Sequence, residues 1–117
     1  MTTRIEEDQL RGLAEAAGVE TVLPILDAFW ASNDELLAAL EAALSTNDAA
    51  AVASTGHALK GSASNLGATS LAETAKTVEM AGKAGDVETA RDAAAKLPEE
   101  IESTKVAFGT LMDSIAA

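Results

Sequence analysis

The chain contains one histidine, His57, and no cysteine. A neutral imidazole nitrogen is a nucleophile, and it also carries protons near neutral pH. Without cysteine there is no thiol nucleophile, no disulfide and no cysteine-based metal site. A zinc site with a single histidine would need mostly carboxylate ligands, which is unusual. We therefore expect covalent chemistry to be built around His57, with no metal and no other cofactor.

The segment around His57 predicts a helix over about residues 49–66. At about 100° per residue, four apolar side chains fall within roughly 40° of one another and define its buried face: Val52, Leu59, Ala63 and Leu66. His57 lies about 140° from Val52 on the same helical wheel, so its imidazole is expected to face solvent. The residues that share this outer face are small: Ala50, Ala53, Ser54, Gly61 and Ser64.

Two glycines near the histidine suggest that something approaches this helix closely. Gly56 directly precedes His57, and Gly61 follows it by one turn on the same stripe. Inside a helix glycine costs about 1 kcal/mol relative to alanine. The common alternatives are a histidine satisfied in the core and a histidine placed incidentally on the surface. The first conflicts with the helical wheel, and the second does not explain the glycines.

Charged side chains stand at helical distances from the histidine. Lys60 is a neighbour three residues later, and its ammonium group would stabilise an anionic group attached to the imidazole. If the next helix runs antiparallel after a turn near Ala68, Glu79 lies level with His57, at the flank of its own helix. Its carboxylate would accept a hydrogen bond from Nδ1–H and leave Nε2 as the free nucleophile. Lys83 is a second candidate cation, and ordinary surface roles are the alternative for all three residues.

The composition predicts an all-α fold. Alanine, the best helix former, supplies 27 of the 117 residues, and only three residues are aromatic. Apolar periodicity and turn residues divide the chain into helical segments over about residues 6–17, 20–44, 49–66, 70–84 and 87–115. Short loops make consecutive helices antiparallel. We expect one domain over residues 1–117, an antiparallel up-down four-helix bundle with a short additional helix at the N-terminus.

Local signals predict how these helices begin and end. Gly18 is expected to be a left-handed C-cap, and Pro24 is expected in the first turn of the second helix. Ser70 and Glu73 have the spacing of a capping box. Pro98 lies inside the last segment and should kink or divide it. Side-chain caps are expected at two further helix starts: Asn47 or Asp48, and Asp86.

The charge of the chain argues against several classes of partner. Eight basic side chains stand against 19 acidic ones, which gives a formal net charge of −11. Nucleic acids and anionic membranes both require clustered lysine or arginine, so neither is expected as a partner. The N-terminal residues have no apolar signal-peptide core, and no stretch approaches the ~20 apolar residues of a membrane span. The sequence predicts a cytoplasmic protein, and its polar outer faces favour a monomer.

Residues 57–68, HALKGSASNLGA, closely resemble the signature His-x-Leu-Lys-Gly-Ser-x-x-x-Leu-Gly of histidine-containing phosphotransfer (HPt) domains. A second pattern of the family is matched by Leu71, Ala75, Val78, Glu79, Gly82 and Lys83. The resemblance covers about residues 48–86 strongly and the rest of the chain only by helix arrangement.

The resemblance implies a role for each candidate site residue. His57 would accept the phosphoryl group and Lys60 would stabilise it. Glu79 stands where the family often has glutamine or glutamate facing the histidine. Lys83 stands where arginine is common, so a bidentate phosphate contact would be lost. The surface on which a receiver domain docks would include Gly61, Ala53 and Ser64.

The function that the resemblance implies is a phosphorelay carrier. It would take a phosphoryl group from an aspartate of one receiver domain and pass it to another, in a hybrid histidine kinase or a response regulator. Such carriers have no kinase activity and no cofactor of their own. Two alternatives remain: a bundle that docks receiver domains as a scaffold without phosphotransfer, and a phosphotransferase that uses ATP. A nucleotide-binding P-loop is excluded because Lys60 precedes Gly61 rather than following it.

Overall fold

In the computed structural model, residues 3–116 are described, and all regular structure within this range is helical. The helices are α1 (Asp8–Ala17), α2 (Val19–Ser45), α3 (Ala49–Leu66), α4 (Thr69–Lys83), α5 (Val87–Ala94) and α6 (Leu97–Ala116). The prediction of an all-α fold is confirmed. No helix among residues 3–116 is long and apolar enough to span a membrane.

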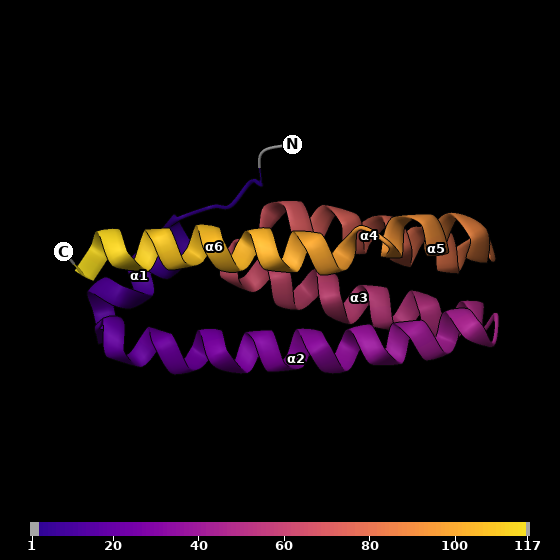
Figure 1. Cartoon of the computed structure of the whole chain (residues 1–117), viewed down its shortest axis with the longest axis horizontal. Helices are drawn as coiled ribbons and strands as arrows, with labels where there is room; N and C mark the ends of the chain where they lie inside the picture. Colours follow the sequence, from indigo (N-terminus) through magenta and orange to yellow (C-terminus); the bar gives the residue numbers. More distant parts are fainter. Residues whose placement is uncertain (1–2, 117) are drawn as a thin grey trace.

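The helices form an elongated body with extents of 47 × 25 × 17 Å. The long helix α2 runs along one side, and α5 and α6 follow one another along the opposite side (Figure 1). α3 lies beside α2, α4 lies beside α5 and α6, and α3 and α4 form an antiparallel hairpin with the most extensive helix–helix contact of the chain. This hairpin carries His57 and Glu79, so its packing positions the candidate site.

The buried face of α3 is the one that the helical wheel predicts, with Val52, Leu59, Ala63 and Leu66 all in the core. Helical periodicity is less accurate at the start of α2. Its spacing groups Ile25 with the core residue Phe29, but Ile25 is 38% exposed, whereas Val22 and Leu26 are buried. The core-facing stripe of α2 is therefore shifted by one residue at this end, where α1 packs against it.

The prediction for the start of α2 is wrong, and the prediction that Gly18 is the left-handed C-cap of α1 is confirmed only for the cap position. Pro24 lies in the second turn of α2, because that helix begins directly after Gly18. Gly18 has a positive φ of 91°, but its ψ of 151° is not left-handed helical. Pro98 behaves as expected, since the last segment divides just before it, between α5 and α6.

The prediction of a capping box at the start of α4 is also wrong, because the side chains of Ser70 and Glu73 bind the N-terminal segment instead of capping the helix. Ser70 Oγ accepts a hydrogen bond from the backbone N–H of Arg4 (2.7 Å), and Glu73 forms an ion pair with the Arg4 guanidinium. The backbone N–H of Glu6 donates to the carbonyl of Gly67 (2.7 Å). Residues 4–6 thus hold the turn between α3 and α4, while Ala68 is the N-cap of α4 and makes no side-chain cap bond.

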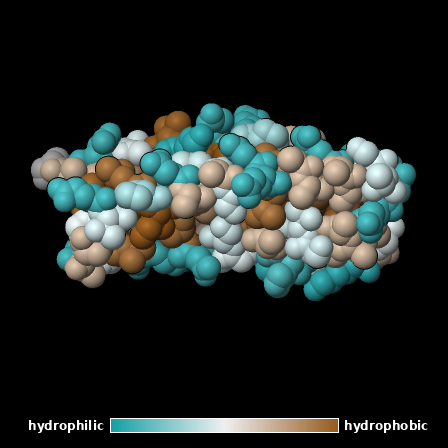
Figure 2. Space-filling view, turned by 90° about the horizontal axis from the view of Figure 1, so that it is seen from below, coloured by the Kyte–Doolittle hydropathy of each residue, from teal (hydrophilic) through white to brown (hydrophobic). Residues whose placement is uncertain are grey.

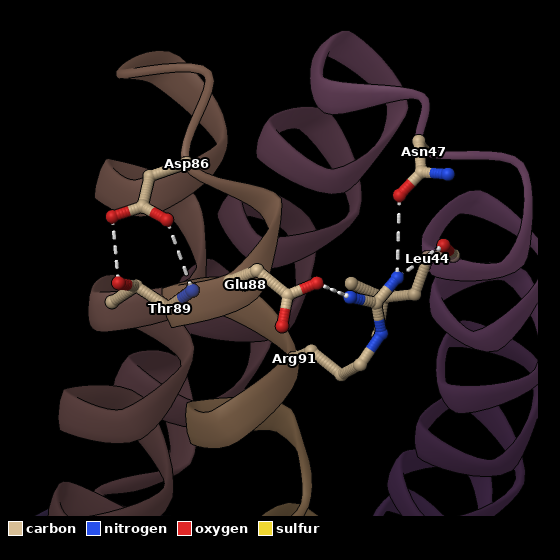
Figure 3. A network of polar contacts seen from close by, with 6 residues as sticks. All are labelled: Leu44, Asn47, Asp86, Glu88, Thr89 and Arg91. Carbon is tan, nitrogen blue, oxygen red and sulfur yellow. Dashed lines mark hydrogen bonds and ion pairs between the residues drawn. The ribbon is translucent and has the colours of Figure 1, made fainter.

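At the other end of the hairpin, two side chains of the α5 region fix the helix ends (Figure 3). Asp86 caps α5 as predicted and accepts hydrogen bonds from the backbone N–H and the hydroxyl of Thr89, which lower the pKa of the Asp86 carboxyl. Arg91 donates to the carbonyl of Leu44 (2.8 Å) and to Oδ1 of Asn47 (3.3 Å). Arg91 therefore adds a charged donor to a carbonyl at the C-terminus of α2 that also accepts from the backbone N–H of Asn47, and a cation there complements the helix dipole.

Candidate functional site

The imidazole of His57 lies on the outside of α3, as the helical wheel predicts. Its side chain is 68% exposed, whereas Gly56 and Leu59 on the other sides of the helix are buried. An exposed ring can be reached by a reacting group carried on another molecule. The first requirement for chemistry at His57, access from solvent, is therefore met.

The carboxylate of Glu79 holds one edge of this ring. His57 Nδ1 lies 2.8 Å from Glu79 Oε2, which is the partnership predicted from the antiparallel register. The position of Glu79 differs from the prediction in one respect. It was expected at the flank of its helix, but its side chain is only 3% exposed.

The burial of Glu79 follows from the closeness of α3 and α4. A Cβ atom added to Gly56 would lie 2.7 Å from the backbone nitrogen of Glu79, and one added to Gly82 would lie 2.6 Å from the backbone nitrogen of Ala53. Only glycine permits this approach at either position, so each helix contributes one. The feature that approaches Gly56 closely is therefore α4. The flank position of Glu79 becomes an interior one because the two backbones are almost in contact.

Two lysines share the same carboxylate. Lys60 Nζ lies 2.8 Å from Glu79 Oε1, and Lys83 Nζ lies 3.3 Å from Glu79 Oε2. The hydrogen bond from Lys60 is the main cause that lowers the pKa of Glu79 from 4.5 to about 2; burial opposes it, and hydrogen bonds from His57 and Lys83 add to it. Glu79 is therefore ionised at neutral pH, and the prediction that Lys60 and Lys83 stand near His57 agrees with this geometry.

The charge of Glu79 determines the tautomer of His57. An ionised carboxylate can only accept hydrogen bonds, so the proton between the two side chains must be on Nδ1. In a neutral imidazole the other nitrogen, Nε2, then has an unshared electron pair. This nitrogen is therefore free of the contact with Glu79 and can act as a nucleophile.

The three residues expected on the docking surface lie in different surroundings. Around Gly61 the space is open, with nothing within 4 Å of an added Cβ. Ala53 lines a hollow of about 750 Å³ beside His57. Ser64 instead lines a smaller hollow of about 290 Å³ on the far side of Lys60. All three are on the outer side of α3, and Ala53 and Ser64 line different hollows.

Comparison with known proteins identifies the family. A family model described as the Hpt domain matches residues 24–107. The chain belongs to the Hpt family. Among solved structures it is similar to histidine-containing phosphotransfer protein B (HptB) from Pseudomonas aeruginosa PAO1, with 29% identity, a TM-score of 0.83, and coverage of 95% of this chain and 96% of that one. A search of curated proteins gave no significant match.

Membership of the Hpt family has functional consequences at the level of the family. Hpt proteins are phosphocarriers rather than kinases, and they interact with receiver domains of two-component proteins. The chain is thus a histidine phosphotransfer protein of the phosphorelay type.

Sequence reasoning did not reveal the structural role of Gly82. The available signal was its position inside a predicted helix, where a glycine needs a reason.

Proposed function

We propose that this Hpt protein carries a phosphoryl group on Nε2 of His57 between aspartates of receiver domains, as one cytoplasmic domain formed by residues 1–117. The observation that carries the proposal is the exposed imidazole whose Nδ1–H is held by the buried, ionised carboxylate of Glu79. In this proposal α2, α3, α4 and the α5–α6 pair are the four columns of an antiparallel bundle, and α1 is a short addition.

The proposed step is an exchange of one bond to phosphorus for another. The electron pair of Nε2 attacks the phosphorus of an aspartyl phosphate, the N–P bond forms, and the P–O bond breaks to release the aspartate as a carboxylate. Nδ1 keeps its proton, and Glu79 accepts the hydrogen bond from it and keeps the ring oriented. Transfer to a second receiver domain reverses the same step on another carboxylate.

Lys60 and Lys83 balance the incoming charge in this proposal. A phosphoryl group on Nε2 brings additional negative charge to a site that already contains the Glu79 carboxylate. Both ammonium groups contact that carboxylate, so they are close enough to turn toward phosphoryl oxygens and form charge-assisted hydrogen bonds. Phosphoryl transfer depends mainly on such positioning and charge neutralisation.

A panel of phosphorylated receiver domains tests the proposal. The wild-type chain should take up phosphate that is labile in acid, and the His57→Gln variant should take up none while still binding the same receiver domain. If His57→Gln becomes labelled like the wild type, the phosphoryl group is not on His57. If the wild type binds receiver domains but takes up no phosphate, the chain is a docking scaffold. Labelled ATP alone should leave the chain unlabelled, and labelling would show that it is a kinase.

The role proposed for Gly61 has its own test. Leucine at this position would project into open space, so the Gly61→Leu variant should fold normally and yet transfer phosphate more slowly, because its side chain separates the docking partners. Circular dichroism checks the fold, and rapid-quench kinetics measures the transfer. Transfer at the wild-type rate would show that no partner approaches α3 closely at this turn.

A further inference from the structure

The seam between α2 and α6 lies on the opposite side of the bundle from His57. α2 packs against α3 and α6, and α4 packs against the same two helices, so the α2–α6 contact is across the bundle from the α3–α4 contact. The start of α2 and the end of α6 lie at the same end of the molecule (Figure 1). A molecule bound along this seam therefore leaves the imidazole accessible.

A groove runs along this seam near the start of α2 and the end of α6. Its volume is about 190 Å³, which is below the roughly 300 Å³ of the smallest ligand pockets and suits a single bulky side chain. The buried side chains of Leu26, Phe108 and Met112 form its base, and the more exposed Leu23 and Trp30 line it nearer the surface. Figure 2 shows apolar side chains gathered at this end of the α2 face.

All three aromatic residues of the chain meet at this seam. The ring centroids of Phe29 and Trp30 are 4.9 Å apart, and those of Trp30 and Phe108 are 6.0 Å apart. Both phenylalanines are buried, whereas Trp30 remains partly exposed in the groove. Core packing accounts for the phenylalanines, but a tryptophan that reaches the surface is typical of the residues that anchor protein interfaces.

Gly109 leaves one wall of the groove open. It lies inside α6, where glycine costs about 1 kcal/mol relative to alanine. Gly56 and Gly82 are required by the close approach of α3 and α4, but nothing lies within 4 Å of a Cβ atom added to Gly109. Packing within the chain therefore does not explain this glycine, and it fits a position that another molecule approaches closely.

The margins of the groove are acidic. Asp27 on α2 and Asp113 on α6 line it, and the one basic side chain of α6, Lys105, lies over the Trp30 ring at 5.6 Å from its centroid. α2 has five carboxylates and no basic residue. Four of the five recur every seven residues and so follow one side of the helix: Glu20, Asp27, Asp34 and Glu41. The charge around the groove favours a cationic partner.

We infer that the α2–α6 groove binds a second partner protein through a basic amphipathic helix. This helix inserts one bulky apolar side chain beside Trp30 and places lysine or arginine near Asp27 and Asp113. Helices bind apolar grooves through anchors spaced three, four and seven residues apart. Charge complementarity selects a basic helix over a second copy of this chain, whose net charge is −11. Such a partner holds the protein in place while His57 remains free on the other side of the bundle.

A designed helical peptide is the probe. It has leucines spaced three, four and seven residues apart on one face and lysines at the other positions. Trp30 is the only tryptophan of the chain, so its fluorescence reports binding at the groove. The wild-type chain should bind this peptide saturably. A control peptide with alanine in place of leucine keeps the charge and should bind at least about tenfold more weakly, because it has no anchor.

Two substitutions on α6 locate the peptide. Gly109→Leu fills the groove from a position with open space, and it should weaken binding about tenfold or more through loss of the anchor contact. Thr110→Leu is the matched control, since Thr110 is exposed on the same helix but does not line the groove, and its affinity should stay within about twofold of the wild type. Asp27→Asn should weaken binding and reduce its dependence on salt. Circular dichroism and thermal unfolding identify any variant whose fold has changed.

Each other result counts against the inference. If Gly109→Leu binds like the wild type, or if Thr110→Leu loses as much affinity, the peptide is not in the groove. Equal binding of the alanine peptide would show that charge alone attracts it, and no saturable binding up to about 1 mM would show that the groove receives no such helix. A dimer in sedimentation that Gly109→Leu abolishes would show that a second copy occupies the groove.

A final measurement separates this surface from the site at His57. Saturating peptide should leave the rate at which phosphoramidate phosphorylates the wild-type chain within about twofold of its value without peptide. Strong inhibition would place the peptide beside His57 and overturn the inference. Binding is measured on the unphosphorylated chain, so its outcome does not depend on the proposed function.

Discussion

Glu79 is the residue on which the geometry of the site depends. Its two carboxylate oxygens contact one imidazole and two ammonium groups, although its own side chain is buried. A buried carboxylate without such partners would be neutral at neutral pH, because burial disfavours the charged form. Here the paired cations keep it ionised, so it can both orient His57 and hold the lysines close to the ring.

The two lysines should contribute unequally to transfer. Lys60 is 32% exposed and lies 2.8 Å from the carboxylate, whereas Lys83 is 60% exposed and lies 3.3 Å away. Solvent screens the more exposed charge more strongly. Loss of a charge-assisted hydrogen bond costs about 1.5–3 kcal/mol, so Lys60→Gln should slow transfer roughly 10-fold to 150-fold. Lys83→Gln should slow it less, and rapid-quench kinetics would contradict this order if Lys83→Gln had the larger effect.

The lowered pKa of Glu79 predicts how stability depends on pH. Its pKa is about 2 in the folded chain against 4.5 ordinarily, so its ionised form stabilises the fold fully above pH 4.5. This stabilisation is lost as the pH falls toward 2, because the unfolded state then binds a proton that the folded state does not. Thermal unfolding of Glu79→Gln, which cannot titrate, provides the comparison. The curves of melting temperature against pH should converge between pH 4.5 and 2, and parallel curves would contradict the assignment.

At the scale of elements, the site depends on how closely α3 and α4 approach. Gly56 and Gly82 each face the backbone of the opposite helix, so the close contact is reciprocal and the two glycines lie about one turn apart along it. This closeness buries Glu79 and brings Lys60, on α3, within reach of the carboxylate, whereas Lys83 lies one turn from Glu79 on α4 itself. Residues 4–6 hold the turn between α3 and α4, and at the other end of the bundle Arg91 connects α5 to the C-terminus of α2.

Alanine substitution of the glycines should distinguish the effect of close packing between α3 and α4 from the effect of intrinsic helix propensity. Gly56→Ala and Gly82→Ala would place a methyl group less than 3.0 Å from backbone atoms, so each should destabilise the fold by roughly 1–3 kcal/mol through overpacking. Gly61→Ala meets no atom within 4 Å and should stabilise α3 by about 1 kcal/mol through its better helix propensity. Urea unfolding measures all three. Destabilisation by Gly61→Ala, or tolerance of both other substitutions, would contradict this view of the hairpin.

The sequence was sufficient for the properties that depend on helical periodicity and on the antiparallel register of neighbouring helices. Helical periodicity placed His57 outside and Val52 inside, and an antiparallel turn near Ala68 placed Glu79 opposite the ring. It was not sufficient for properties that depend on the distance between helices. The burial of Glu79 and the contact of Gly82 with α3 arise only when two backbones meet. Likewise, the spacing of Ser70 and Glu73 suggested a capping box. The contact that Ser70 actually makes, with Arg4, joins residues 66 positions apart and cannot be read from local spacing.

At the scale of the whole molecule, an acidic chain places two lysines beside His57, and the carboxylate that they share is buried. The face seen in Figure 2 is largely hydrophilic, and its apolar areas lie mainly toward the end where α2 begins, interrupted by polar residues. The net charge of −11 produces repulsion between copies of the chain. It also leaves the surroundings of His57, with two lysines, as the favourable place for an anionic group to approach.

The charge predicts that the chain is a monomer in solution. At low ionic strength repulsion between copies is strongest, because the Debye length increases as salt is removed. Sedimentation equilibrium should therefore give the mass of one chain at both low and moderate salt. A dimer that persists at low salt would show that an apolar contact outweighs the repulsion, and would contradict the prediction.

The central claim is that Nε2 of His57 accepts the phosphoryl group because Glu79 occupies Nδ1. The most direct test is NMR of the ¹⁵N-labelled chain after phosphorylation by a receiver domain, with ¹⁵N–³¹P coupling used to identify the bonded nitrogen. The predicted result is one phosphoryl group, on Nε2 of His57. Phosphorus on Nδ1, or on any other residue, would contradict the account.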